Sequence, residues 1–204
     1  MDSYILHEPG ETCQDGYMKF KYVSGRRCLD FAGTLKYRDS AREELLTNPQ
    51  QLSDWAVQAG LVDAVIEITD DELAAAIALR EAIYRIVFAR LEGGRPKVAD
   101  VDLLNEHASQ PQLTPLLHPN GSVSRDGTAP QLLARLAADL LNLLAGPDIE
   151  KVRECSDPGC TRLYIDASRA QNRHWCGMRT CGNRAKVQAF RARQRAAAGA
   201  LQAS

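Results

Sequence analysis

The sequence predicts a mainly α-helical protein with a few short strands: a helical N-terminal domain followed by a small, treble-clef-like zinc finger with four cysteine ligands. Three observations predict this class. Several segments carry apolar residues at helical spacing between capping and stop signals. Four of the six cysteines gather near the C-terminus. The segment after them is rich in arginine and alanine and contains no acidic residue.

The first predicted elements are short. Tyr17–Val23 alternates and is rich in aromatic residues, which predicts a strand. Residues 26–35 fit either a strand or the start of a helix. Asn48-Pro49 is a typical N-cap followed by proline at the first helical position, so we expect a helix from there to Gly60.

Two further helices follow. Thr69-Asp70-Asp71-Glu72 is a capping box, and it should open a helix that runs to about Glu92. Gly93-Gly94 ends that helix, because neighbouring glycines favour turns. A shorter helix is expected over Ala99–Ala108.

A small hairpin is predicted from Leu113–Leu117 and Val123, which flank the turn pair Asn120-Gly121. Pro130 then opens a leucine-rich helix that ends at Gly146. The apolar face of this helix is wide, which places the helix in the core.

The predicted domain boundary is Pro147-Asp148, which divides the chain into residues 1–147 and 148–204. The net charge of −1 hides an asymmetry between these parts. Residues 151–204 hold 11 basic and 3 acidic side chains, whereas residues 1–150 hold 14 and 23. Such an asymmetry indicates that the basic tail meets a polyanion, although a solvated helix or docking on the acidic domain would also explain it.

Nothing in the sequence predicts a membrane protein. No stretch reaches the roughly 18 apolar residues of a membrane span, and residues 1–11 lack the pattern of a secretory signal. We therefore expect a cytoplasmic protein, in which thiols stay reduced.

The cysteine cluster follows the pattern C-x4-C-x15-C-x4-C, with Cys155, Cys160, Cys176 and Cys181. Zinc takes four ligands tetrahedrally, and thiolates are its usual ligands in structural sites. Disulfides, an iron–sulfur cluster or unligated core cysteines are the alternatives. We expect structural Zn²⁺ with a closed shell and no catalytic position.

Within the finger, Leu163–Ile165 predicts a strand, and turn-forming residues from 166 to 172 lead back to Trp175 as a hairpin. A helix should start after Cys181, with Val187 and Phe190 packed on that hairpin. The predicted nucleic-acid contacts come from this helix and from the hairpin tip, because guanidinium groups suit phosphates and guanine edges. They are Arg169, Arg173, Arg184, Lys186, Arg191 and Arg195, with Arg184, Arg191 and Arg195 along one face.

The run WCGMRTCGNRAKVQAFRARQR, preceded by CSDPGC and LYIDAS, closely resembles the CGNR zinc finger. The segments GRRCLDFAGT, LSDWAVQAGL, ALREAIYRI and LLNEH resemble the ABATE domain that accompanies this finger, so the resemblance covers about residues 17–195. It implies a stress-responsive transcription regulator whose finger binds DNA, with the four cysteines as zinc ligands. Two residues depart from the pattern: Gly33 replaces an expected asparagine, and Gly177 replaces an expected serine.

For the N-terminal domain we consider a small-molecule sensor, with Asp30, Arg38 and Arg80 as candidate ligand-binding residues. Structural ion pairs are the simpler explanation of these three side chains. No catalytic or phosphate-binding motif is present, so we expect no enzyme.

The leading hypothesis is therefore a regulator that binds double-stranded DNA, with a homodimer and an unknown small-molecule effector as further expected partners. A zinc-stabilised protein-interaction module and an RNA-binding module are the alternatives.

Overall fold

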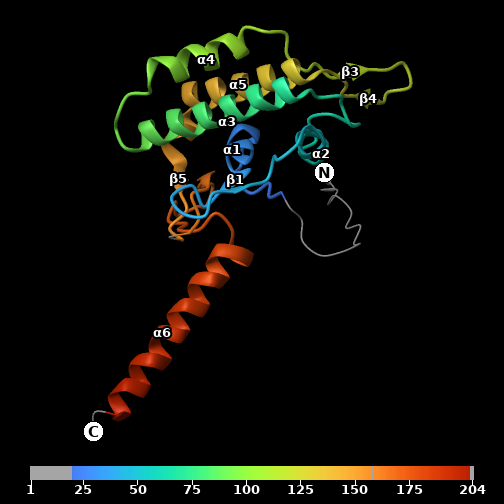
Figure 1. Ribbon diagram of the computed structural model, residues 1–204. Coiled ribbons are helices and arrows are strands. Elements are labelled where there is room, and N and C mark those ends of the chain that lie inside the picture. Colours follow the sequence, from blue (N-terminus) through green and yellow to red (C-terminus); the bar gives the residue numbers. More distant parts are fainter. Residues whose placement is uncertain (1–19, 158, 203–204) are drawn as a thin grey trace.

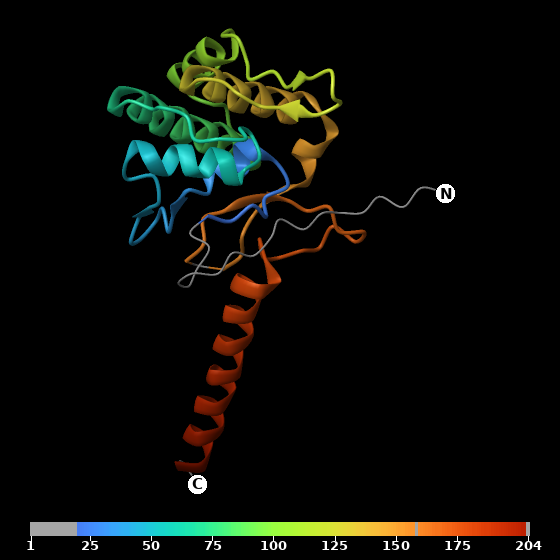
Figure 2. The same cartoon turned by 90° about the vertical axis from the view of Figure 1, so that its right-hand side faces the viewer.

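The computed structural model describes residues 20–157 and 159–202. A helical body holds α1 (Arg27–Ala32), α2 (Pro49–Gln58), α3 (Asp70–Leu91), α4 (Val98–Ala108) and α5 (Ala129–Ala145). A small module with β5 (Val152–Glu154), β6 (Leu163–Ile165) and α6 (Asn183–Gln202) lies on one side of the body, and α6 extends away from it (Figures 1 and 2). This is the predicted mainly helical class, and the strands among the described residues are two or three residues long.

The core of the body forms where α3 packs against α1, α4 and α5. Leucines on one face of α5 point into it: Leu132, Leu136 and Leu140 are fully buried. Trp55 of α2 is also fully buried, and its ring centroid lies 5.0 Å from that of Phe31 in α1. The wide apolar face of α5 therefore occupies the core, as its leucine spacing predicted.

Local capping signals set the helix starts. The side chain of Asn48 accepts a hydrogen bond from the Gln51 N–H at 3.0 Å, with Pro49 at the first helical position. At α3, Thr69 and Glu72 form the complete capping box. The helices predicted from residues 49, 69, 99 and 130 are thus confirmed within two residues at their start.

The first residues of the body differ in part from expectation. Of the predicted strand Tyr17–Val23, residues 20–23 form no strand, and residues 17–19 lie outside the described part. The ambiguous segment 26–35 forms helix α1 and then enters β1 (Leu35–Lys36), which pairs with β2 (Glu43–Glu44). The predicted hairpin is present as β3 (Leu116–Leu117) and β4 (Val123–Ser124).

The small module begins with the 3-10 turn η1 (Pro147–Lys151). Strand β5 (Val152–Glu154) follows and pairs antiparallel with β6 (Leu163–Ile165), so that Val152 faces Ile165. The prediction that Leu163–Ile165 forms a hairpin with the segment near Trp175 was wrong. β6 pairs instead with β5, the strand before the first cysteine. One π-helical turn, η2 (Met178–Gly182), leads into α6 (Asn183–Gln202).

The module packs against the body through several specific contacts. The Ile165 N–H of β6 donates to the Ser24 carbonyl at 2.8 Å. The Tyr84 hydroxyl of α3 donates to Glu154 of β5 at 3.3 Å. The buried guanidinium of Arg162 donates to the carbonyl oxygens of Lys21 and Gly33 at 3.2 and 3.0 Å. These bonds hold the cysteine cluster at a defined place beside α1 and β1.

Candidate metal centre and its arginine-rich helix

The four clustered cysteines converge on one point. Their four Sγ atoms all lie within 4.8 Å of one another. The Sγ atoms of Cys160 and Cys176 are 3.7 Å apart, as are those of Cys176 and Cys181. A tetrahedron with zinc–sulfur bonds of about 2.3 Å has edges of about 3.8 Å, whereas a disulfide needs about 2.05 Å. The spacing therefore fits a tetrathiolate metal site and not disulfides.

Two tight backbone turns present these thiols. In the first, the Cys160 N–H donates to the Asp157 carbonyl at 2.7 Å, while the Gly159 N–H donates to the Asp157 carboxylate at 3.2 Å. In the second, the Gly182 N–H donates to the Gly177 carbonyl at 3.1 Å as η2 turns into α6. Both turns are short loops that bring their flanking cysteines together on one side of the metal position.

A third set of bonds joins the two turns. The Ser156 N–H donates to the His174 carbonyl at 2.8 Å, which holds the segments next to the ligands side by side. The Cys176 N–H donates to the Sγ of Cys155 at 3.4 Å, a bond that favours the thiolate form of Cys155.

The electrostatics of the cluster call for a cation. Hydrogen bonds from Cys160 and the other neighbouring thiols hold the pKa of Cys155 below its ordinary value. The pKa of Cys176 is raised, and the largest cause is its hydrogen bond with Cys155. One thiolate therefore opposes ionisation of the next, and all four can be thiolates together only when a bound metal ion compensates the charge.

Cys28 lies apart from this site. Its side chain is fully buried in the body core, where burial raises the pKa of its thiol. It therefore behaves as a small core hydrophobe.

Arg173, which the sequence analysis placed among the nucleic-acid contacts, is engaged inside the module. Its guanidinium lies 4.7 Å from the ring centroid of Tyr164, and its Nε donates to the Trp175 carbonyl at 2.7 Å. A second donor contacts the Cys176 carbonyl, and the Tyr164 hydroxyl donates to the carbonyl oxygen of Arg173 itself. The structure thus gives Arg173 a bracing role beside the third cysteine.

Arg184, at the start of α6, is shared between the module and its surface. It forms an ion pair with the buried Asp157 at 3.2 Å, and 39% of its side chain is exposed. Asn183, the preceding residue, donates from Nδ2 to the Arg179 carbonyl at 3.3 Å and remains exposed. This hydrogen bond ties the turn between Cys176 and Cys181 to the start of α6.

The remaining cations of α6 are exposed. Within the described part of the chain they form no ion pair, and α6 itself carries no acidic residue. Arg169 is exposed on the turn after β6. The four exposed cations of α6 are Lys186, Arg191, Arg193 and Arg195.

Val187 and Phe190 do not pack on the hairpin as expected. Their exposed fractions are 48% and 55%, so that prediction was wrong. The reason is the direction of α6, which leaves the module instead of folding back over it (Figures 1 and 2).

The three candidate ligand residues of the body have partners within the chain. Arg80 is 1% exposed and bonds both carboxylate oxygens of Glu44 at 2.6 and 2.7 Å. Arg38 pairs with Glu81 at 2.5 Å and lies 4.0 Å from the ring centroid of Tyr84.

Asp30, the third candidate, is buried and accepts the Ser24 N–H at 3.0 Å. Burial raises the pKa of its carboxyl. Arg27 also pairs with Asp30 at 3.5 Å, so each of the three candidates has an ion-pair partner within the chain.

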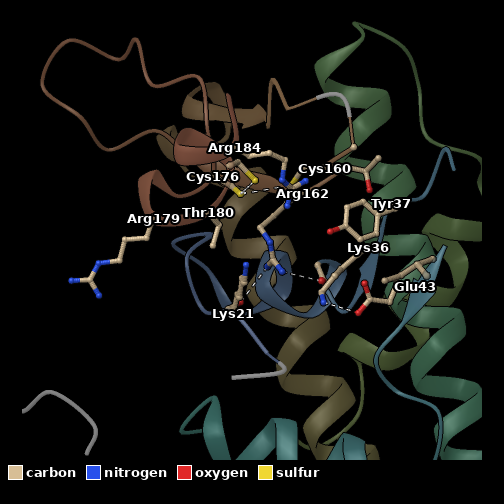
Figure 3. Close-up of a pocket in the computed structure, with 15 residues that line it drawn as sticks. Lys21, Lys36, Tyr37, Glu43, Cys160, Arg162, Cys176, Arg179, Thr180 and Arg184 are labelled. Atoms are coloured by element: carbon tan, nitrogen blue, oxygen red, sulfur yellow. Dashed lines mark hydrogen bonds and ion pairs between the residues drawn. The ribbon is translucent and has the colours of Figure 1, made fainter. Parts of the chain in front are cut away.

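A cavity of about 550 Å³ lies elsewhere, between the metal centre and strands β1 and β2. Figure 3 shows the guanidinium of Arg162 in its wall, with the Lys36–Glu43 pair opposite and Arg179 pointing away. Arg162 and its acceptor Gly33 were not among the site residues predicted from the sequence. The one signal was Gly33 itself, noted as a departure from the expected pattern.

The comparisons with known proteins agree with this geometry. Residues 25–147 match a family model named ABATE, described as "Putative stress-induced transcription regulator". Residues 151–194 match the CGNR zinc finger. No curated protein matches the chain. Among the helices in the described part, none combines the length and apolar character needed to cross a membrane. Because the ABATE match covers more than half of the chain, the chain belongs to the ABATE family, and it carries a CGNR zinc finger that holds a four-cysteine metal site.

Proposed function

We propose that this protein is a DNA-binding transcription regulator in which a structural zinc ion positions α6 against duplex DNA. The observation that carries the proposal is the state of α6. It extends away from the body (Figure 1), its charged residues are all basic, and four of its cations are exposed and form no ion pair with the residues that the structure describes. Such a helix gains its partner from outside the chain, and a polyanion complements its charge.

Zinc is the metal that the donor set favours. Four thiolates in a tetrahedron suit Zn²⁺, and a closed tetrathiolate shell leaves no position for a substrate or a catalytic water. The ion therefore has a structural role, and we assign no enzymatic activity to the protein. Reduced thiols are needed for this site, which is consistent with a cytoplasmic protein.

The body and the finger have separate tasks in this proposal. The β5–β6 side of the finger contacts the body through Arg162 and Glu154. The α6 side stays open. The form of the protein-interaction alternative in which the α6 arginines lie against the acidic body is not favoured, because Arg191 and Arg195 are exposed. A homodimer and a small-molecule effector remain predictions from the sequence.

The test is the binding of the full-length, zinc-loaded protein to random duplex DNA at increasing salt. Each phosphate contact contributes about 0.9 to the slope of log K against log salt, so four or five contacts give a slope of about −4. The double variant Arg191→Ala/Arg195→Ala should lose about two units of slope. Gln188→Ala, an exposed and uncharged position on the same helix, is the matched control.

Two outcomes would overturn the proposal. One is the absence of binding at low salt with zinc fully loaded. The other is preferential binding of duplex RNA over duplex DNA of the same length, which would instead establish the RNA-binding alternative.

A further inference from the structure

We propose that one face of α6 reads base edges in the major groove, and that its target is rich in A·T pairs. This inference rests on the proposed DNA binding and adds which side of the helix faces the bases. The face is formed by four exposed residues, which we call the reading face: Asn183, Val187, Phe190 and Gln194.

Helical geometry places these four residues together. They stand at i, i+4, i+7 and i+11, so at about 100° per residue they fall within an arc of about 60°. From Asn183 to Gln194 the reading face is about 16 Å long at about 1.5 Å per residue. An α-helix of about 10–12 Å diameter fits a major groove about 12 Å wide.

The cations of α6 flank this face on both sides. Arg184, Arg191 and Arg195 lie about 90° from its centre in one direction, and Lys186 and Arg193 lie about 80° from it in the other. A helix that points its reading face at the groove floor thus aims one row of cations at each phosphate strand. The face opposite the reading face is uncharged and carries Ala185, Gln188, Ala189 and Ala192.

The chemistry of the face fits A·T pairs. Asn and Gln side chains bond the N6 and N7 edge of adenine, and apolar side chains contact the C5-methyl group of thymine. Phe190 and Val187 are about half exposed, so a thymine methyl would cover surface that is otherwise in water. Asn183 is held at the helix start by its bond to Arg179 and would read the base nearest the finger.

Charge selects DNA over a second copy of this chain as the occupant. Two reading faces brought together would place the basic rows of both helices side by side, and α6 has no acidic residue to pair with them. The phosphate strands of a duplex meet both rows with the opposite charge.

The experiment uses full-length, zinc-loaded protein and a duplex recovered by in vitro selection from a randomised pool. The recovered site is then compared with a copy in which deoxyuridine replaces thymidine, which removes the methyl groups and keeps every phosphate and base pair. We expect an A·T-rich site, and an affinity loss of about fourfold for each contacted methyl. Phe190→Ala should discriminate between the two probes about fourfold less than the parent protein, because Val187 keeps its own methyl contact, while Gln188→Ala should discriminate like the parent protein.

The outcomes separate this inference from the proposed function. If the protein binds no duplex at all, the proposed function and the inference both fail. If it binds duplex DNA but selects G·C-rich sites or none, or if Phe190→Ala discriminates like Gln188→Ala, only the inference fails. It also fails if Phe190→Ala turns a dimer into a monomer in sedimentation while discrimination is unchanged, because the face would then be a self-interface.

Discussion

Gly33 and Arg162 fit each other across the junction between body and finger. Nη2 of Arg162 donates to the Gly33 carbonyl at 3.0 Å, and a Cβ built on Gly33 would lie 2.2 Å from Nη1 of the same guanidinium. The glycine that departs from the pattern of the resembled family is therefore the residue that lets the finger's arginine reach the backbone of the body.

Gly33→Ala should destabilise the protein by about 1–3 kcal/mol, because the new methyl group must displace a buried guanidinium. Urea unfolding measures the loss. The matched control is Gly94→Ala, whose Cβ would meet its nearest neighbour at 3.5 Å and should cost less than about 0.5 kcal/mol. In an Arg162→Ala background the cost of Gly33→Ala should shrink, and equal costs in both backgrounds would contradict the contact.

Removing the metal should unfold the finger, since so small a module depends on its ion for folding energy. Trp175 lies beside Cys176 and packs on the cysteine cluster, so its fluorescence should change when a chelator is added. The change is recorded in Trp55→Phe, which silences the core tryptophan. Cys176→Ser should lose the metal, whereas Cys28→Ala should retain about one ion per chain by elemental analysis; equal metal content in both would contradict the site.

Arg173 and Arg195 should differ although both are basic residues of the finger. Arg173→Ala removes the cation over Tyr164 and two donors to backbone carbonyls, so we expect about 1–3 kcal/mol of lost stability and weaker metal retention. Arg195→Ala should leave both unchanged and reduce the salt slope of DNA binding by about one. Chelator competition and salt titration of the two variants distinguish the roles; identical profiles would count against them.

Arg80→Ala should cost about 3–5 kcal/mol, because it leaves Glu44 without its buried partner and removes one of the two buried arginines that pair with Glu81. The matched control is Arg125→Ala, which breaks an ion pair with Asp63 in which the side chains are 44% and 43% exposed. That change should cost about 1 kcal/mol or less. Thermal unfolding measures both, and a small loss for Arg80→Ala would contradict a structural role.

His107 should make the protein less stable as the pH falls below about 6.5. Burial lowers the pKa of its imidazole. The unfolded chain then binds the proton more readily than the folded one, so the stability contribution is present above the unfolded pKa and is lost as the pH falls. The stability difference between the parent and His107→Asn should therefore change between about pH 7.5 and 5.5, and a flat difference would contradict the shift.

The features that the sequence determined by itself depend on residues that lie only a few positions apart in the chain. The capping box at Thr69 and Glu72, the proline after Asn48 and the leucine spacing of α5 act over one or two helical turns, so pattern alone predicted those helices. The cysteine spacing predicted the metal site for a similar reason, since each pair needs only one tight turn to bring its two thiols together.

The tertiary structure decided which distant segments meet, and identical residue types acquired different roles from it. β6 pairs with Val152–Glu154 and not with the segment near Trp175, because the register of a three-residue strand depends on which segment the body brings beside it. Arg173 folds onto Tyr164, while Arg191 remains in solvent. Spacing could not separate the two, because the difference is the presence of an aromatic ring and free carbonyls within reach, and that presence is fixed only once the chain has folded.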